Sequence, residues 1–252
     1  MRPNLLVLAG TTEATTLAKA MHARGLTGTL SFAGRVARPK AHPLDQRIGG
    51  FGGVEGLVTY LRDNNITHVV DATHPFAAQM SCNAIEACQK ADVPLIALTR
   101  PPWLAQADDR WTHLSDIAAA VQALDGPQRQ VMLAVGRMHL QEFAPNPQHF
   151  YLLRLIDPPS VLPPLPNHHV IIGRGPFTHE GDLALLQKHE IEVVVSKNAG
   201  GTAAYAKISA ARELGLPVLM IDRPNIPPRR EARSAQDVID WRTGHEVTLR
   251  GV

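Results

Sequence analysis

The fold is decided at residues 5–14, Leu5-Leu6-Val7-Leu8-Ala9-Gly10-Thr11-Thr12-Glu13-Ala14. The apolar run at its start predicts a short buried strand, and the glycine and threonines behind it predict a tight turn. Apolar residues then recur at helical spacing at Ala14, Leu17, Ala18 and Met21. A strand that passes through a turn into an amphipathic helix is the first half of a βαβ unit, from which parallel sheets are built.

The same alternation of apolar runs and amphipathic helices continues along the whole chain. Strands are predicted at residues 5–9, 29–33, 68–72, 94–98, 131–135, 151–155, 170–172, 193–196 and 218–221. So many strands exceed the usual single small sheet. The pattern therefore predicts an α/β fold with two Rossmann-like domains and mainly parallel sheets.

The domain boundary is predicted within residues 100–129, where Pro101, Pro102, Gly126 and Pro127 flank one helix at residues 116–124. We therefore expect a first domain at residues 1–125 and a second at residues 126–252. A last helix is predicted near residues 235–242. The pattern does not say which domain this helix packs against.

The composition limits the classes of function. The chain has 252 residues, 44% of them hydrophobic, and its net charge of +2 without a basic run argues against a nucleic-acid partner. Its apolar runs are too short for a signal peptide or a membrane span. Cys82 and Cys88 point to faces about 120° apart on one predicted helix, so they cannot bridge each other. We expect a cytoplasmic protein in a reducing compartment.

No metal site is expected, although the chain has twelve histidines. There is no HExxH motif and no paired CxxC motif, and the adjacent His168 and His169 cannot easily share one ion.

Ligands of parallel sheets bind beyond the carboxyl ends of the strands, so the turns there carry the chemistry. After the first strand, Gly10, Thr11, Thr12 and Glu13 lead into a helix whose N–H groups can hold a phosphate. The turn is not a GxGxxG fingerprint, and a plain helix cap is the alternative.

The end of the second strand bears on the kind of nucleotide. NAD enzymes place an acid there, but this chain has Ser31, Phe32, Ala33, Gly34 and Arg35. The Arg35 guanidinium suits a 2′-phosphate, which favours NADP over NAD, and a solvated surface arginine is the alternative.

Two further turns of the first half extend this nucleotide hypothesis. Gly50, Phe51 and Gly52 lie in a four-glycine stretch at residues 49–53, and such a stretch indicates close approach to a phosphate or ribose unless it is simply a flexible loop. Thr73 and His74 follow the next strand and could frame a nicotinamide, although a lone histidine is more often structural.

In the second half, three strand ends each combine a glycine with a cation. These are Gly136-Arg137, Gly173-Arg174 and Lys197-Asn198-Ala199-Gly200. Such turns suit a ligand with several carboxylates, although each alone could be a helix cap with a surface charge.

Together these motifs resemble the precorrin-6A reductase family of cobalamin biosynthesis. The motifs are Gly10 to Ala14, Gly49 to Gly53, Asp71 to Ala77, Gly173 to Phe177 and Ser196 to Thr202, and the resemblance runs over nearly the whole chain. It implies a reductase that transfers hydride from NADPH to one carbon–carbon double bond of precorrin-6A, giving precorrin-6B.

The resemblance also implies roles for single residues. Cofactor contacts are expected from Gly10, Thr11, Thr12, Glu13, Arg35, Gly50, Phe51, Gly52, Thr73 and His74. Substrate contacts are expected from Phe76, Arg137, Gly173, Arg174, Lys197, Asn198 and Gly200. His74, Lys197 or a bound water could deliver the proton, and contact with neighbouring pathway enzymes is a further hypothesis.

Several alternatives stay open. The substrate could be metal-free or carry cobalt, and the oligomeric state is not indicated. A non-catalytic NADP-binding sensor and an S-adenosylmethionine-dependent methyltransferase are rival functions. A short-chain carbonyl reductase would need a Tyr-x-x-x-Lys pair, but Asn64, Leu155 and Ser209 follow the three tyrosines at that spacing.

Overall fold

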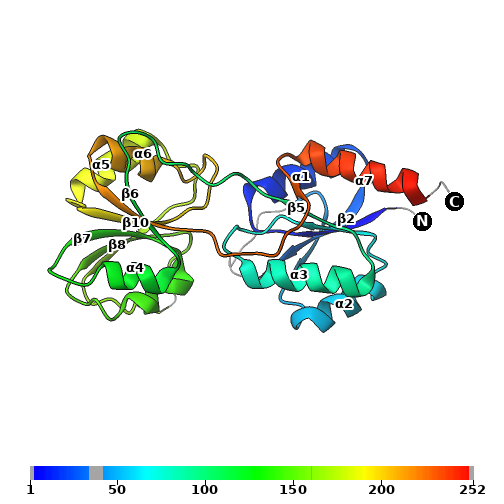
Figure 1. Cartoon of the computed structure of the whole chain (residues 1–252), viewed down its shortest axis with the longest axis horizontal. Coiled ribbons are helices and arrows are strands. Elements are labelled where there is room, and N and C mark those ends of the chain that lie inside the picture. The colour runs from blue at the N-terminus through cyan, green and yellow to red at the C-terminus, as the bar shows by residue number, and fades with distance from the viewer. Residues whose placement is uncertain (1–2, 34–41, 160, 250–252) are drawn as a thin grey trace. The chain divides into compact units, whose positions relative to one another are not determined.

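The computed structural model describes residues 3–33, 42–159 and 161–249 (Figure 1). The chain forms two compact units, one made of Met1–Arg100 with Asn225–Val252 and the other of Pro101–Pro224. Each unit is built on its own parallel sheet with helices on both faces. The predicted α/β fold with two Rossmann-like domains is confirmed.

The sheet of the first unit has six parallel strands in the order β12-β5-β4-β1-β2-β3. The strands are β1 (Asn4–Leu8), β2 (Thr27–Phe32), β3 (Asp45–Ile48), β4 (His68–Asp71), β5 (Leu95–Leu98) and β12 (Glu231–Ala232). The helices α1 (Thr12–Ala23) and α7 (Ala235–Leu249) cover one face, and α2 (Gly53–Asp63) and α3 (Ala78–Ala91) cover the other (Figure 1).

The core of this unit follows from the alternation of side chains along β1. Leu5 and Val7 pack into the cluster that contains Leu17 of α1, whereas Leu6 and Leu8 pack into the cluster on the α2 and α3 face. These four of the five β1 residues are at most 1% exposed, as a strand covered on both faces requires.

The sheet of the second unit is also parallel, in the order β6-β11-β10-β7-β8-β9. The strands are β6 (Arg110–Leu114), β7 (Gln130–Ala134), β8 (Phe150–Leu155), β9 (His168–Ile172), β10 (Val193–Lys197) and β11 (Pro217–Ile221). Its helices are α4 (Ile117–Ala123), α5 (His179–Lys188), α6 (Ala206–Glu213) and the 3-10 helix η1 (Arg137–Phe143). Figure 1 shows α5 and α6 on one face of this sheet and α4 on the other.

The two units have exchanged their sixth strands. β6 follows β5 in the chain, yet it pairs with β11 in the second sheet. In turn β12 follows β11, yet it pairs with β5 in the first sheet. The chain therefore crosses between the units twice, once after Arg100 and once before Asn225.

This exchange explains where the structure differs from the sequence prediction. The first segment of the first unit ends at Arg100, at the start of the predicted boundary region, and the second unit begins at Pro101 instead of residue 126. The segment from Asn225 onward, which the sequence predicts in the second domain, returns to the first unit because β12 completes its sheet.

All nine predicted strands are present, and three more were missed. The missed strands are β3, β6 and β12, each at the edge of its sheet. These three strands carry exposed polar residues, such as Asp45 and Gln46 in β3, so they lack the apolar run that marks a central strand. Cys82 and Cys88 are free thiols on α3, as their spacing predicted.

Candidate functional site

The first unit gathers its predicted site residues at the carboxyl ends of β1, β3 and β4. We call these turns, Gly10–Glu13, Gly49–Gly53 and Asp71–Phe76, the first-unit edge. β1 lies between β2 and β4 in the sheet, so the turn after β1 is at the point where the strand order reverses. Ligands of parallel sheets bind at such a switch point.

Thr11 closes the turn after β1. Its hydroxyl donates to the Ala72 carbonyl at 2.8 Å and accepts from the Ala14 N–H at 3.2 Å, so it caps α1 and ties the β1 and β4 turns together. The Cα of Gly10 faces open space, because a Cβ built there meets no atom within 4 Å. The hydroxyl of Thr12 lies 3.1 Å from Glu13 Oε2.

Glu13 forms an ion pair at the start of α1. Its Oε2 lies 2.7 Å from Nη1 of Arg100, which comes just after β5, and both side chains are largely buried. Burial acts to raise the pKa of Glu13, but the backbone hydrogen bond and the ion pair with Arg100 outweigh it and lower the pKa below its usual value. The pair neutralises a carboxylate at the helix end that is expected to receive a phosphate.

The glycine stretch before α2 presents bare backbone. Gly52 is the N-cap of α2 with φ 82°, and no side chain caps the helix there. A Cβ built on Gly49, Gly50, Gly52 or Gly53 meets nothing within 4 Å. This helix end can therefore offer its N–H groups to an anion at close range.

Asp71 organises the turn after β4. Its side chain is 1% exposed and lies 2.5 Å from Nη1 of Arg229. Its oxygens also accept from the Thr73 N–H at 3.1 Å, the Thr73 hydroxyl at 2.7 Å and the Ser81 hydroxyl at 2.6 Å. The Thr73 hydroxyl thus points inward, and the turn is held by a buried ion pair.

His74 has a defined tautomer when it is neutral. Its Nδ1 accepts the Phe76 N–H at 3.2 Å, so the neutral ring carries its proton on Nε2. The rings of His74 and Phe76 lie 5.9 Å apart. Both predicted residues are therefore together at the first-unit edge, in one turn.

The second unit places its predicted residues in the same way. The second-unit edge consists of Gly136–Met138, Ile172–Arg174 and Lys197–Gly201, at the carboxyl ends of β7, β9 and β10. Arg137 and Arg174 are exposed, and Arg174 Nη2 lies 3.8 Å from Asp157 Oδ1. Lys197 is the last residue of β10 and is half-buried.

Asn198 and Gly200 have structural partners that the sequence did not indicate. The side chain of Asn198 is buried and hydrogen-bonds the backbone of Trp103. At Gly200 the space of a Cβ is filled by the carbonyl of Pro101. Their expected contacts with a substrate stay predictions.

Exposed apolar side chains also lie at the carboxyl ends of β7, β8 and β9, and the sequence gives no sign of their exposure. Met138 follows β7, Ile156 follows β8 and Ile172 ends β9, and they are 67%, 50% and 47% exposed. The sequence does not distinguish them from buried apolar neighbours such as Leu155, so only the structure shows that they are exposed and that the strands they follow or end are neighbours. Combined with Arg137 and Arg174, they make an edge that is apolar and cationic.

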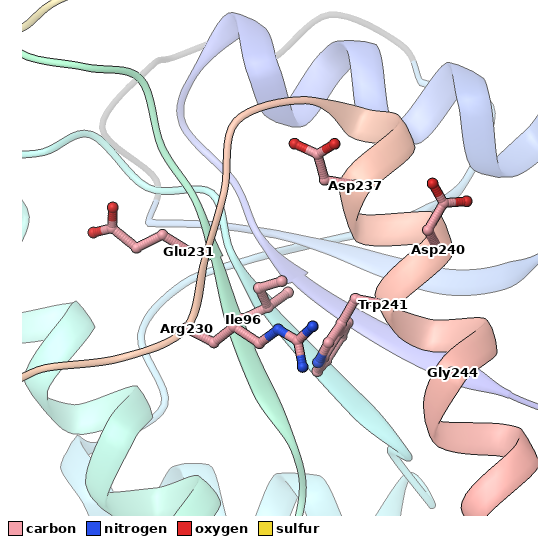
Figure 2. A pocket seen from close by; sticks show the side chains of 7 residues that line it. All are labelled: Ile96, Arg230, Glu231, Asp237, Asp240, Trp241 and Gly244. Atoms are coloured by element: carbon pink, nitrogen blue, oxygen red, sulfur yellow. The ribbon is translucent and has the colours of Figure 1, made fainter.

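A pocket of about 540 Å³ lies elsewhere in the first unit, beside β5, β12 and α7 (Figure 2). Its lining is Ile96, Arg230, Glu231, Asp237, Asp240, Trp241 and Gly244. None of these is a predicted site residue. The Asp237 carboxylate accepts hydrogen bonds from the backbone N–H groups of Arg233 and Ser234, so it stabilises the start of α7.

Arg35 lies outside the described residues. Among the described residues, no group of three His, Cys, Asp or Glu side chains is arranged to hold a metal ion. In the same part of the chain, no helix has the length and apolar character that crossing a membrane requires.

Comparison with known proteins gives matches along almost the full chain. The family model described as "Precorrin-6x reductase CbiJ/CobK" matches residues 4–243. A precorrin-6A reductase of Rhodobacter capsulatus is 54% identical over 98% of this chain and 99% of its own length. A cobalt-precorrin-6A reductase of Priestia megaterium is 30% identical over 88% of this chain and 91% of its own length. The solved structure titled "CobK precorrin-6A reductase" matches with a TM-score of 0.92 at 54% identity, covering 96% of this chain and 97% of that one.

Proposed function

The chain belongs to the precorrin-6x reductase CbiJ/CobK family, and from this premise we propose that it reduces one carbon–carbon double bond of precorrin-6A with NADPH, giving precorrin-6B. The observation that carries the proposal is the 54% identity to a precorrin-6A reductase over 98% of the chain. The identity to a relative named for the cobalt-bearing substrate is only 30%, which favours the metal-free substrate.

The first-unit edge suits a dinucleotide. Gly10, Gly50 and Gly52 face open space, so a pyrophosphate or ribose can approach their backbone without a clash. The N-termini of α1 and α2 supply N–H groups and positive dipole ends for the phosphates. Arg35 stays our candidate for the 2′-phosphate, because no acid ends β2 at Ser31 and Phe32.

The second-unit edge suits a large ring with carboxylate arms. The guanidinium groups of Arg137 and Arg174 and the ammonium group of Lys197 can pair with acetate and propionate groups. The exposed Met138 and Ile172 can contact the apolar ring system. A Cβ built on Gly173 would lie 3.3 Å from the Phe177 ring, so the glycine keeps this turn compact, and its contact with the substrate stays a prediction, as does that of Phe76.

Reduction adds a hydride and a proton. NADPH supplies the hydride when bound, and the chain's own residues have to orient the reactants and deliver the proton. Neutral His74 can donate a hydrogen bond through Nε2, because Nδ1 accepts the Phe76 N–H, whereas transfer of a proton to the substrate requires the imidazolium, in which Nδ1 no longer accepts that N–H. Lys197, at the end of β10, is the other candidate.

The test is NADPH oxidation by the purified protein with precorrin-6A and, separately, with cobalt-precorrin-6A. Turnover with precorrin-6A supports the proposal, and faster turnover of the cobalt form would assign the other branch. NADPH binding without turnover of either substrate would favour the sensor. If neither NADPH nor NADH binds, the reductase proposal fails.

The role of Arg35 is tested by nucleotide titration. Arg35→Ala should lower the preference for NADPH over NADH by about 1–3 kcal/mol, the range for a hydrogen bond to a charged group. Arg24→Ala is the matched control, since Arg24 lies at the C-terminal end of α1 in the same unit. An equal loss of the preference for NADPH in both variants would show that Arg35 does not bind the 2′-phosphate.

A further inference from the structure

Arg47 lies on β3, which pairs with β2. It is paired in register with Ser31 of β2, so the two side chains lie on the same face of the sheet. NAD-binding sheets place an acid at the end of this second strand to bind the ribose hydroxyls. Here the neighbours are a serine and an arginine.

The guanidinium of Arg47 is held at the first-unit edge by neutral groups. Nη1 donates to Ser31 Oγ at 2.7 Å and to the Gly49 carbonyl at 3.1 Å. Nη2 donates to the Gly50 carbonyl at 3.0 Å. The central carbon lies 3.9 Å from the centroid of the Phe51 ring and 5.1 Å from that of Tyr60. No carboxylate of the described residues forms an ion pair with Arg47.

These contacts leave Arg47 with charge and donors to spare. A guanidinium carries five N–H groups, and the described contacts use three of them. The stacked ring and three hydrogen bonds fix the plane of the group, so little side-chain entropy remains to be lost when an anion binds. The half-buried site also strengthens the attraction between the cation and an anion.

We propose that Arg47 is a specificity-determining residue, which selects the 2′-phosphate of NADP(H) while its neutral hydrogen bonds hold the glycine turn. This inference rests on the proposed function, because it assumes a dinucleotide at the first-unit edge. It adds Arg47 to Arg35 as a second cation for the 2′-phosphate, one that no sequence motif indicates.

A purely structural role makes a different prediction. If Arg47 only holds Gly49 and Gly50 in place, its loss weakens every nucleotide to the same extent. If it also binds the 2′-phosphate, its loss weakens only nucleotides that carry this group. The difference between 2′,5′-ADP and 5′-AMP therefore separates the two roles without any enzyme assay.

The experiment is calorimetric titration of the full chain with 2′,5′-ADP and 5′-AMP, for the natural protein, Arg47→Met, Arg47→Lys and the control Arg24→Met. We expect the natural protein and the control to prefer 2′,5′-ADP by at least about tenfold. Arg47→Met should lose most of this preference while 5′-AMP binding falls less. Arg47→Lys keeps the charge without the planar fork and should lose part of the preference.

The outcomes separate the two proposals. If the natural protein shows no preference for 2′,5′-ADP, the proposed use of NADPH fails, and this inference fails with it. If the preference exists and Arg47→Met keeps it, or loses both ligands equally, the inference is overturned while the proposed function stands. Should Arg47→Met not fold, an unchanged preference in Arg47→Lys overturns the inference.

Discussion

The side chain of Asn198 pairs with the backbone of Trp103 in both directions. Its Oδ1 accepts the Trp103 N–H at 2.8 Å, and its Nδ2 donates to the Trp103 carbonyl at 3.0 Å. Arg223 donates through Nε to the Asn198 carbonyl at 3.0 Å and through Nη2 to the Ala199 carbonyl at 3.1 Å. Trp103 lies in the connection that follows Arg100, and Arg223 lies in the connection that precedes Asn225. The loop after β10 therefore binds both connections where they join the second unit.

Asn198→Ala should therefore destabilise the second unit. It leaves the buried N–H and carbonyl of Trp103 without their partners, which costs about 2–4 kcal/mol in the free energy of unfolding. Urea unfolding measures this loss, and Asn225→Ala, at an exposed asparagine, is the control. A loss equal to that of the control would mean that the pairing contributes nothing.

Gly200 and Gly215 form a matched pair for testing how tightly the first connection is held. Both have a left-handed backbone, with φ of 69° and 62°, so alanine is strained at either position by about 1–2 kcal/mol. A Cβ at Gly200 would also lie 2.1 Å from the Pro101 carbonyl oxygen, whereas one at Gly215 meets nothing within 4 Å. Gly200→Ala should cost at least about 1–3 kcal/mol more than Gly215→Ala in chemical unfolding. Equal costs of the two substitutions would show that Pro101 shifts to make room for the new Cβ at residue 200.

The sequence predicted the central strands well because their apolar runs reflect burial on both faces. It could not predict the exchange of β6 and β12. An apolar pattern shows that a strand needs neighbours, but it does not say which sheet supplies them. The edge strands that are exchanged also carry the weakest pattern, since Glu231 and Arg110 are exposed.

The binding of ligands beyond the carboxyl ends of parallel strands predicts which turns share one edge of a sheet, but it does not predict their long-range partners. Asp71 and Arg229 are 158 residues apart in sequence, and Glu13 and Arg100 are 87 apart. Nothing in the local sequence of either residue indicates such a partner. These arginines could be found only once the chain path past β5 and into β12 was known.

Trp241→Ala should unfold the first unit before the second. Trp241 of α7 is 5% exposed and belongs to the core cluster that contains Leu17 of α1 and Ile96 of β5. Removing the indole should cost about 3–5 kcal/mol, and Trp241→Phe clearly less. Hydrogen exchange shows which unit loses stability, and we expect reduced protection of the backbone amides in β1 and β5. Reduced protection in the second unit instead would contradict the assignment of α7.

Lys207 should make stability depend on pH. Burial, with a smaller contribution from Arg154, lowers the pKa of its ammonium from 10.5 to about 7, although Nζ donates to the Ala204 carbonyl at 2.7 Å. Between these pH values the unfolded chain binds more protons, so the free energy of unfolding should rise with pH from about 7 to about 10. Below about pH 7 the folded state carries the full penalty of a buried cation.

The measurement is urea unfolding of Lys207→Met at about pH 6 and about pH 9. At the lower pH the variant should be more stable than the natural protein by about 1–3 kcal/mol, and at the higher pH the difference should shrink. Lys188→Met, at an exposed lysine at the end of α5, is the control and should show no such trend. A difference that does not change with pH would show that Lys207 stays charged.

Arg100→Met should weaken nucleotide binding through Glu13. Without its partner at 2.7 Å, the Glu13 carboxylate stands unpaired at the N-terminus of α1 and repels a phosphate there. We expect NADPH affinity to fall by about 1 kcal/mol or more, and Glu13→Gln in the same chain to restore most of it. The pKa of Glu13 is lowered in the folded state, so the stabilisation by this pair is present above the ordinary carboxyl pKa and is lost as the pH falls through the lowered value. Fluorescence titration of NADPH into the single and double variants measures the loss of affinity and its restoration, with Arg24→Met as control. If Glu13→Gln does not restore binding, Arg100 acts on the nucleotide or on the fold by a route other than neutralising Glu13.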